Sequence, residues 1–266
     1  MISLFGGLKG FYHSFKIQLR VIYALLMREI ITRYGRHNVG FLWLFIEPMI
    51  FTLLIAIFWQ VVRSSGAGQN IPIIPFAVIG YSVVLCWRNS VSRTTKAISA
   101  NSGLLYHRNV TVIDVFLARV YLEVFGATVS FMALSVIFHL AGFMPMPDDF
   151  LYMAIGWLLM IWFAIGLSFT IGAVCEMSDV ANRLWSTLSI VLFPISGVAF
   201  FVHWLPELAR EPVLYIPMVH LTEMIRHGYY GDVIPTYENI PYLVWCNMML
   251  SFMGLVLVRK IAQGNN

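Results

Sequence analysis

Long apolar stretches separated by short polar segments dominate the pattern of this chain. About 20 mostly apolar residues are the length that an α-helix needs to cross the hydrocarbon core of a bilayer. Hydropathy, together with the Gly, Pro and charged residues that bound each stretch, predicts six membrane-spanning helices. They are expected over residues 41–62, 72–90, 112–140, 151–174, 184–204 and 241–258. The predicted fold class is therefore an all-α integral membrane protein, with one domain over residues 1–266.

Residues 11–34, ahead of the first span, follow a helical period instead. The apolar residues of this stripe, three and four positions apart, are Phe15, Leu19, Ile22, Leu26 and Ile30. The basic residues that lie off the stripe are Lys16, Arg20 and Arg28. This pattern predicts an N-terminal amphipathic helix in the cytoplasmic membrane interface, which we favour over a soluble helix because a membrane span follows within a few residues. Gly35 and Gly40 are then expected to turn the chain into the membrane.

The segment 205–240, before the last expected span, is interrupted by prolines and has apolar runs too short to cross a bilayer. Irregular backbone at membrane depth occurs only where it is buried in protein or lines a wet cavity. We therefore expect two short helices, over about 206–212 and 218–228, that dip into the outer leaflet like re-entrant helices. They form either the outer vestibule of a conduit or a surface cap without a role in transport.

Composition supports a membrane protein and sets its orientation. The chain is 59% hydrophobic and 11% charged, whereas soluble domains carry about a quarter charged residues. With a cytoplasmic N-terminus, Arg63, Arg210 and Arg226 are the only three of the 17 Lys and Arg residues that fall outside. The positive-inside rule therefore predicts that both termini are cytoplasmic. Nucleic-acid binding is not expected, because no basic segment stands apart from the spans.

Energy for transport would have to come from another chain. No G-x-x-x-x-G-K-[ST] motif occurs, so this sequence has no ATP-binding loop of its own. The polar and basic stretch 91–111 is the one substantial cytoplasmic connection between the expected spans. Asn101 or Ser102 is placed to cap a short helix there. Such a helix would offer a grip to a peripheral partner, although a plain connector remains the alternative.

Charges and aromatics within the spans are candidates for a conduit. Glu47 precedes Pro48 in the first span, and Glu123 follows Arg119 in the third. Charges at membrane depth face the bundle interior or water, so each acid is either paired with a neighbouring Arg or a substrate contact. Tryptophans such as Trp43, mostly near the expected span ends, fit an interfacial belt, but some could offer flat faces to a sliding sugar polymer.

Enzyme sites are not expected. Ser196 lies in "PISGVAFFVH", which is similar to the serine segment of an intramembrane protease, but the preceding glycine and a histidine base in the sixth span are absent. The outer histidines lack metal-binding spacing. The three cysteines, which have no C-x-x-C spacing, are read as apolar fillers. We predict no catalytic residue, no metal and no cofactor in this chain.

Three stretches resemble the ABC-2-type permeases of polysaccharide exporters. Residues 33–49 read "RYGRHNVGFLWLFIEPM", and residues 76–120 contain the loop "LLYHRNVTVIDVFLAR". Residues 216–232 read "IPMVHLTEMIRHGYYGD" and are similar to N-P-L-x-H-x-x-E-x-x-R-x-x-x-x-G, with Ile216 in place of the usual asparagine. The loop is most similar to Gram-negative capsule exporters, because many O-antigen and teichoic-acid relatives have Phe-Pro in it.

The resemblance implies the transmembrane subunit of an ATP-driven exporter. Two copies of this chain would form a central conduit in the bacterial inner membrane, and two copies of a separate ABC ATPase would bind ATP and Mg. The substrate would be a capsular polysaccharide with a lipid terminus, moved from cytoplasm to periplasm and passed to periplasmic and outer-membrane export proteins.

The resemblance also assigns roles to residues. The ATPase-coupling residues would be Asn101, Ser102, Gly103, Leu104, Leu105, Tyr106, His107 and Arg108. The interfacial residues ahead of the first span would be Arg28, Arg33, Tyr34 and Arg36. The candidates for the conduit or its exit are Trp43, Glu47, Trp59, Trp87, His220, Glu223, Arg226, Tyr229 and Tyr230.

Two other interpretations stay open. The permease could carry another glycan, such as O-antigen or teichoic acid. A protein of a different class, a non-transporting scaffold or enzyme of glycan assembly, would lack the ATPase. Co-purification of a stoichiometric ATPase therefore separates transporter from scaffold.

Overall fold

A computed structural model describes residues 2–35, 38–64, 72–105 and 110–264 of the chain. These residues form helices joined by short connections, with no strand among them. The longer helices are α1 (Ile2–Tyr34), α2 (Asn38–Ser64), α3 (Ile73–Thr94), α5 (Val112–Leu140), α6 (Phe150–Met177), α7 (Asp179–Phe193) and α10 (Ile240–Gly264). The shorter ones are η1 (Ser99–Asn101), α4 (Ser102–Leu105), η2 (Pro194–Val198), η3 (Val202–Trp204), α8 (Glu207–Val213), α9 (Pro217–Tyr230) and η4 (Gly231–Val233).

Five helices are long and apolar enough to cross a membrane: α2, α3, α5, α6 and α10. They match five of the six spans predicted from the sequence. The boundaries of α5 agree with its expected range because both ends have local signals. Thr111 and Asp114 form a capping box at its start, and Gly142 turns the chain with φ +79° just after its end.

The remaining expected span, the fifth in chain order at residues 184–204, is not one continuous helix. Its first part belongs to α7, which has 15 residues and ends at Phe193. Pro194 then begins the π-helical turn η2, inside which Gly197 has a φ of +83° that only glycine adopts readily. The described helices therefore do not confirm the count of six spans.

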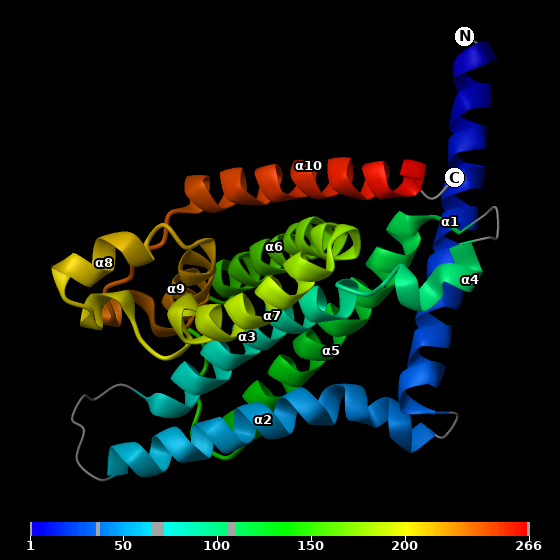
Figure 1. Cartoon of the computed structure of the whole chain (residues 1–266). Helices are drawn as coiled ribbons and strands as arrows, with labels where there is room; N and C mark the ends of the chain where they lie inside the picture. Colours follow the sequence, from blue (N-terminus) through cyan, green and yellow to red (C-terminus); the bar gives the residue numbers. More distant parts are fainter. Residues whose placement is uncertain (1, 36–37, 65–71, 106–109, 265–266) are drawn as a thin grey trace.

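α3 is the centre of the bundle and is buried along almost its whole length, between α2, α5, α6 and α9. In contrast, α2 and α10 expose most of their apolar surface. Figure 1 shows these helices running side by side, with α8 and α9 at one end of the bundle and α4 at the other. We name these the α8 end and the α4 end.

α1 runs across the α4 end of the bundle, in a different direction from the long helices (Figure 1). It spans more residues than the expected 11–34. Gly35, which follows it, has a φ of +78° and makes the expected turn, whereas Gly40 lies inside α2. Phe15 and Leu19 are exposed, and Ile22, Leu26 and Ile30 are half-buried. Whether α1 lies on a membrane surface remains a prediction.

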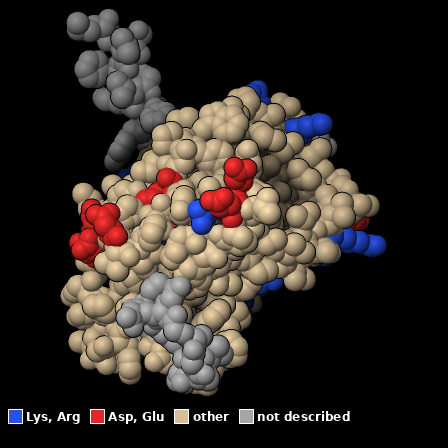
Figure 2. Space-filling model, turned by 90° about the vertical axis from the view of Figure 1, so that its left-hand side faces the viewer, with Lys and Arg blue, Asp and Glu red and all other residues tan. Residues whose placement is uncertain are grey.

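The α8 end is acidic. Figure 2 looks onto this end, and red acidic side chains lie across its middle, while most blue basic side chains are near its edge. The negative charge of this end agrees with the loop "MPMPDD" over residues 144–149, which has two acidic residues and no basic one. It fits the sequence-based expectation that the basic residues gather toward the opposite end.

Candidate functional site

The described part of the connection between α3 and α5 begins with buried residues and continues to exposed ones. Ala97 and Ile98 are buried at its start. They belong to a small apolar cluster, which we call the loop core, that also contains Val112, Val115, Phe116, Phe169, Ala173 and Val258. Ser102 and Gly103, a few residues later, are exposed. The start of the loop is therefore fixed, and the loop is accessible at Ser102 and Gly103. Of the other predicted coupling residues, the side chains of Leu104 and Leu105 and all of Tyr106, His107 and Arg108 lie outside what the structure describes.

Asn101 attaches this loop to α1. Its side-chain oxygen accepts a hydrogen bond from Nη1 of Arg28 at 2.8 Å, and its Nδ2 donates to the carbonyl of Ala97, also at 2.8 Å. Both ends of the Asn101 amide are therefore engaged, one with α1 and one within the loop, and capping of the short helix by Asn101 or Ser102 stays a prediction. Two predicted residues, Arg28 and Asn101, are brought together here although they are 73 positions apart.

Glu176 is a second anchor, one that sequence reasoning missed. Its Oε1 accepts hydrogen bonds from the backbone N–H groups of Ile98 at 2.6 Å and Ser99 at 3.3 Å. A carboxylate at the end of an expected span is a weak signal by itself. Nothing in the spacing of Glu176 connects it with a loop 78 residues earlier.

Five charged residues form a network where α1, α3 and α5 meet. Arg33 pairs with Glu29 at 2.8 Å and also with Glu123, which in turn lies 3.3 Å from Nε of Arg93. Arg119 completes the network through Glu29 at 3.4 Å and the carbonyl of Arg93 at 2.8 Å. Glu123 is thus paired with arginines, as one of the two interpretations expected, but not with its sequence neighbour Arg119.

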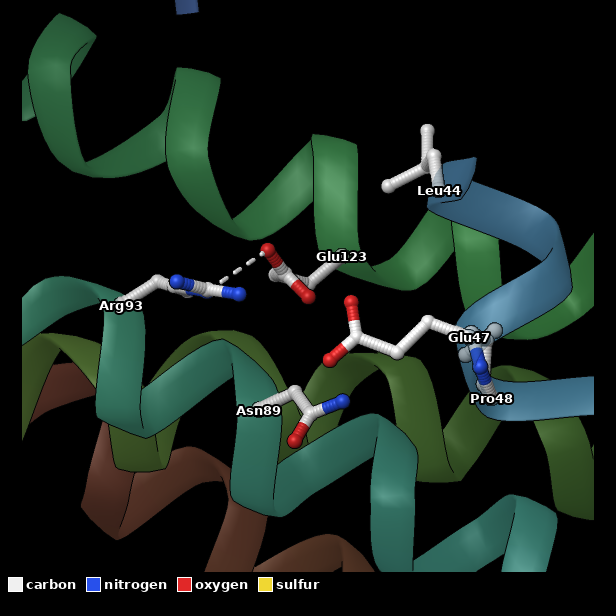
Figure 3. Close-up of a pocket in the computed structure, with 7 residues that line it drawn as sticks. Leu44, Glu47, Pro48, Asn89, Arg93 and Glu123 are labelled. Atoms are coloured by element: carbon white, nitrogen blue, oxygen red, sulfur yellow. Dashed lines mark ion pairs between the residues drawn. The ribbon is translucent and has the colours of Figure 1, made fainter. Parts of the chain in front are cut away.

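A polar hollow of about 50 Å³ lies beside this network. Its lining residues are Leu44, Glu47, Pro48, Asn89, Arg93, Glu123 and Ala127. Figure 3 shows the carboxylate of Glu47 reaching from α2 toward Glu123 and Asn89. Within the described residues, neither Glu47 nor Asn89 has a hydrogen-bonding or ion-pair partner, because Arg93 pairs with Glu123. Within the described residues Glu47 therefore presents an exposed carboxylate, and the choice between an arginine pair and a substrate contact stays open.

At the α8 end, Arg226 of α9 is fully buried and holds the break that follows α7. Its Nη1 donates to the carbonyls of Gly197 and Phe200, both at 2.7 Å, and its Nη2 donates to that of Val198 at 3.1 Å. The guanidinium lies 4.1 Å from the ring centre of Phe76 and 4.6 Å from that of Phe201. Carbonyls freed from a helix in a membrane need internal donors, and Arg226 supplies them.

Two neighbours of Arg226 on α9 bind the same broken segment. Oγ1 of Thr222 donates to the carbonyl of Ser196 at 3.1 Å. Oε1 of Glu223 accepts from the N–H of Val202 at 3.4 Å. One face of α9 is therefore fastened along the irregular backbone after α7. Thr222 was not a sequence-based candidate.

The other outer candidates also bind inside the subunit. His220 accepts from the N–H of Asn239 through Nδ1 at 3.1 Å and contacts the carbonyl of Leu214 through Nε2 at 2.7 Å, so Nε2 carries the proton. The hydroxyls of Tyr229 and Tyr230 donate to the carbonyls of Pro145 at 2.9 Å and Pro72 at 2.8 Å. A role for these residues in an exit remains a prediction.

The three candidate tryptophans differ in exposure. Trp87 is fully buried, Trp59 is half-buried with its ring centre 6.0 Å from that of Phe76, and Trp43 is 52% exposed. Among them, Trp43 has the accessible face that a conduit contact requires. Of the remaining interfacial candidates, the side chain of Tyr34 and all of Arg36 lie outside the described residues.

An ion pair outside the long helices joins α9 to the segment before α10. Nδ1 of His227 pairs with Glu238, which also accepts a hydrogen bond from the hydroxyl of Tyr152 at 3.0 Å. The hydrogen bond with Glu238 raises the pKa of His227. Burial works to raise the pKa of Glu238, but its hydrogen bonds with His227 and neighbouring groups lower it overall.

Comparison with known proteins gives a consistent set of relatives. The model of the ABC-2 type transporter family matches residues 20–230. The capsule polysaccharide export inner-membrane protein CtrC of Neisseria meningitidis serogroup B is 47% identical over 96% of this chain and 96% of its own length. BexB of Haemophilus influenzae, which has the same descriptive name, is 47% identical over 98% of each chain. The polysialic acid transport protein KpsM of Escherichia coli is 28% identical over 92% of this chain and 95% of its own.

Proposed function

Because the chain belongs to the ABC-2 type transporter family, we propose that it is the membrane subunit of an ATP-driven exporter that moves capsular polysaccharide from cytoplasm to periplasm. The observation that carries the proposal is 47% identity, over nearly the whole chain, to two proteins named for capsule polysaccharide export. Those relatives are named inner-membrane proteins, and the five long apolar helices fit that location.

ATP and Mg are bound by a separate ABC ATPase in this proposal, and no cofactor by this chain. The second half of the α3–α5 loop, beginning at Ser102 and Gly103, is the docking surface. The geometry supports this role because the first half is buried in the loop core and tied to Arg28 and Glu176. A docking segment that transmits work has to be accessible on one side and firmly held on the other.

Two copies of this chain, each with one ATPase, form the conduit. The apolar faces that α2, α7 and α10 expose have the character of surfaces that meet lipid or a second copy. Trp43 and Glu47 lie on the exposed side of α2, so they are the candidates for contact with a sliding polymer. A lipid terminus on the polymer and transfer to periplasmic and outer-membrane proteins complete the pathway.

The α8 end is the periplasmic end, with both termini in the cytoplasm. α7 and the irregular segment after it together make the crossing that brings the total to six, the fifth in chain order. α8 and α9 then return the chain within the outer leaflet. His220, Glu223, Arg226, Tyr229 and Tyr230 shape the exit from inside the subunit, since their polar groups bind backbone there.

The test is purification of the tagged chain from its own cells in mild detergent. A stoichiometric ATPase and a bound acidic or neutral capsule polymer are expected, and deletion of the gene should leave polymer inside the cell. Absence of an ATPase would favour the scaffold, and O-antigen or teichoic-acid sugars would favour the other glycans. Unchanged surface capsule in the deletion strain would reject the proposal.

A further inference from the structure

Glu176 stands at the joint between two long helices. It is the second-last residue of α6, and Ser178 is the one residue between α6 and α7. Ser178 is extended, and its hydroxyl accepts a hydrogen bond from the N–H of Ala181 at 3.4 Å, so that α7 begins at once. A force on the side chain of Glu176 therefore acts within one turn of the start of α7.

The carboxylate of Glu176 binds the loop through the backbone. The N–H groups of Ile98 and Ser99 are among the first donors of η1, which have no partner inside that helix. Hydrogen bonds from such groups to a carboxylate are charge-assisted and stronger than neutral ones. The contact therefore holds the loop by its backbone, without using any side chain of the loop.

Apolar packing holds the same end of α6 against the loop. Phe169 and Ala173 of α6 pack with Ala97 and Ile98 in the loop core. Gly172 lets α6 approach the end of α3, where the loop begins, because a Cβ there would lie 2.9 Å from Cβ of Thr94. The loop and the last turns of α6 are thus one packed unit, with Glu176 as its polar fastening.

α7 leads from this unit to the α8 end. Ser189 is its one buried residue, and Trp185, Leu192 and Phe193 pack against the bundle core, so α7 is attached along one side only. It ends in the irregular segment that Thr222 and Arg226 fasten to α9. A continuous set of contacts therefore joins the loop, through Glu176 and α7, to the segment before α8 and α9.

We infer that Glu176 is a positioning residue that transmits movement of the ATPase-docking loop to α7 during export. This inference rests on the proposed function, which makes the loop a docking surface. Coupling between distant sites requires a physical connection that both sites can bias. In the connection from the loop to α7, the carboxylate of Glu176 is the polar contact. Arg28 holds the same loop through Asn101 but leads to α1, not toward the α8 end.

The experiment uses the complete complex of this chain with its ATPase, reconstituted in lipid vesicles with its own polymer. The variants are Glu176→Ala, which removes the acceptor, and Glu176→Gln, which keeps an acceptor oxygen at the same reach. Asp179→Asn is the matched control, since it removes an exposed carboxylate three residues away that has no partner among the described residues. The readouts are ATP hydrolysis, bound ATPase and polymer moved per ATP.

Glu176→Ala is expected to keep its ATPase and hydrolyse ATP within about twofold of the native complex, while polymer moved per ATP falls about tenfold or more, because the hydrogen bonds to both Ile98 and Ser99 are lost. Glu176→Gln should recover most of that loss, and Asp179→Asn should behave as native. Unchanged transport per ATP in Glu176→Ala, or loss of the bound ATPase in that variant, would overturn the inference. If the native complex moves no polymer with ATP, the proposed function fails instead.

Discussion

Arg33, at the end of α1, forms an ion pair with Glu123 of α5, 90 residues further along the chain. Both side chains are largely buried, at 13% and 8% exposed, and Glu29 and Arg93 extend the pair on either side. The helix that crosses the α4 end of the bundle is therefore joined to the bundle by charge, while Phe15, Leu19 and Tyr23 remain on its exposed side.

Glu123→Gln should destabilise this junction. The substitution leaves Arg33 and Arg93 without their shared carboxylate in a poorly solvated place. We expect a loss of about 2 kcal/mol, less than for a fully buried pair because Arg93 is 44% exposed. The measurement is the thermal unfolding midpoint in detergent. Arg20→Gln, an exposed position on α1, is the control, and an equal midpoint for both variants would contradict the prediction.

Gly103→Glu should weaken ATPase binding without unfolding the chain. A Cβ at Gly103 meets no atom within 4 Å, so the larger side chain has room. We expect the amount of co-purified ATPase to fall severalfold. The free energy of unfolding should change by no more than about 0.5 kcal/mol, as for ordinary surface substitutions. Leu208→Glu, on α8 and 94% exposed, adds the same charge at the opposite end and should retain the ATPase. Full retention in Gly103→Glu would argue against docking at this loop.

Glu47→Gln should change transport more than stability. Its carboxylate has no partner among the described residues, so removing the charge breaks no intramolecular contact there. We expect unfolding within about 0.5 kcal/mol of the native chain but severalfold less polymer exported, if the hollow beside Asn89 meets the polymer. Export and unfolding are measured in the same strain, with Glu211→Gln on α8 as the control. Native export by Glu47→Gln would remove Glu47 from the conduit candidates.

Arg226→Lys should release the segment after α7. Lysine keeps the positive charge but lacks the planar guanidinium group, whose several N–H donors bind the carbonyls of Gly197, Val198 and Phe200. We expect a loss of roughly 3 kcal/mol, because buried carbonyls lose their donors. Limited proteolysis should detect faster cleavage within residues 194–204. Arg183→Lys, exposed on α7, should leave cleavage unchanged, and equal cleavage rates in the two variants would refute the assignment.

The pair of His227 and Glu238 should make stability depend on pH. The pKa of His227 is raised, so its contribution is complete below its ordinary value of about 6.5 and is lost as pH rises through the higher folded value. The pKa of Glu238 is lowered, so its contribution is complete above about 4.3 and is lost as pH falls through the lower folded value.

The check is His227→Gln, which should lower the unfolding midpoint more at pH 6 than at pH 9. Tyr152 and Asp232 also face this pair. Asp232 lies 3.7 Å from Nε2 of His227, a weaker contact than that of Glu238, so Asp232→Asn serves as the control. An equal effect of His227→Gln at the two pH values would show that the pair does not carry the pH dependence.

Helix positions could largely be predicted because their signals are local. The expected ranges 112–140, 206–212 and 218–228 correspond closely to α5, α8 and α9, where caps and prolines mark the ends. The prediction of one continuous helix over 184–204 was wrong, because hydropathy is averaged over a window of residues and does not detect the helix break at Pro194. Pro194 and Gly197 were visible in it, but proline and glycine also occur within continuous membrane helices.

The sequence by itself determined which segments are apolar enough to cross a membrane, where most helices begin and end, and that no G-x-x-x-x-G-K-[ST] motif occurs. Only the tertiary structure decided which groups meet: Arg33 with Glu123, Glu176 with the amides of Ile98 and Ser99, and Arg226 with the carbonyls after α7. The physical reason is that the first properties depend on neighbours within a few turns. The second join positions 26 to 90 residues apart, and two of the three use backbone groups, which every residue has and no sequence motif marks.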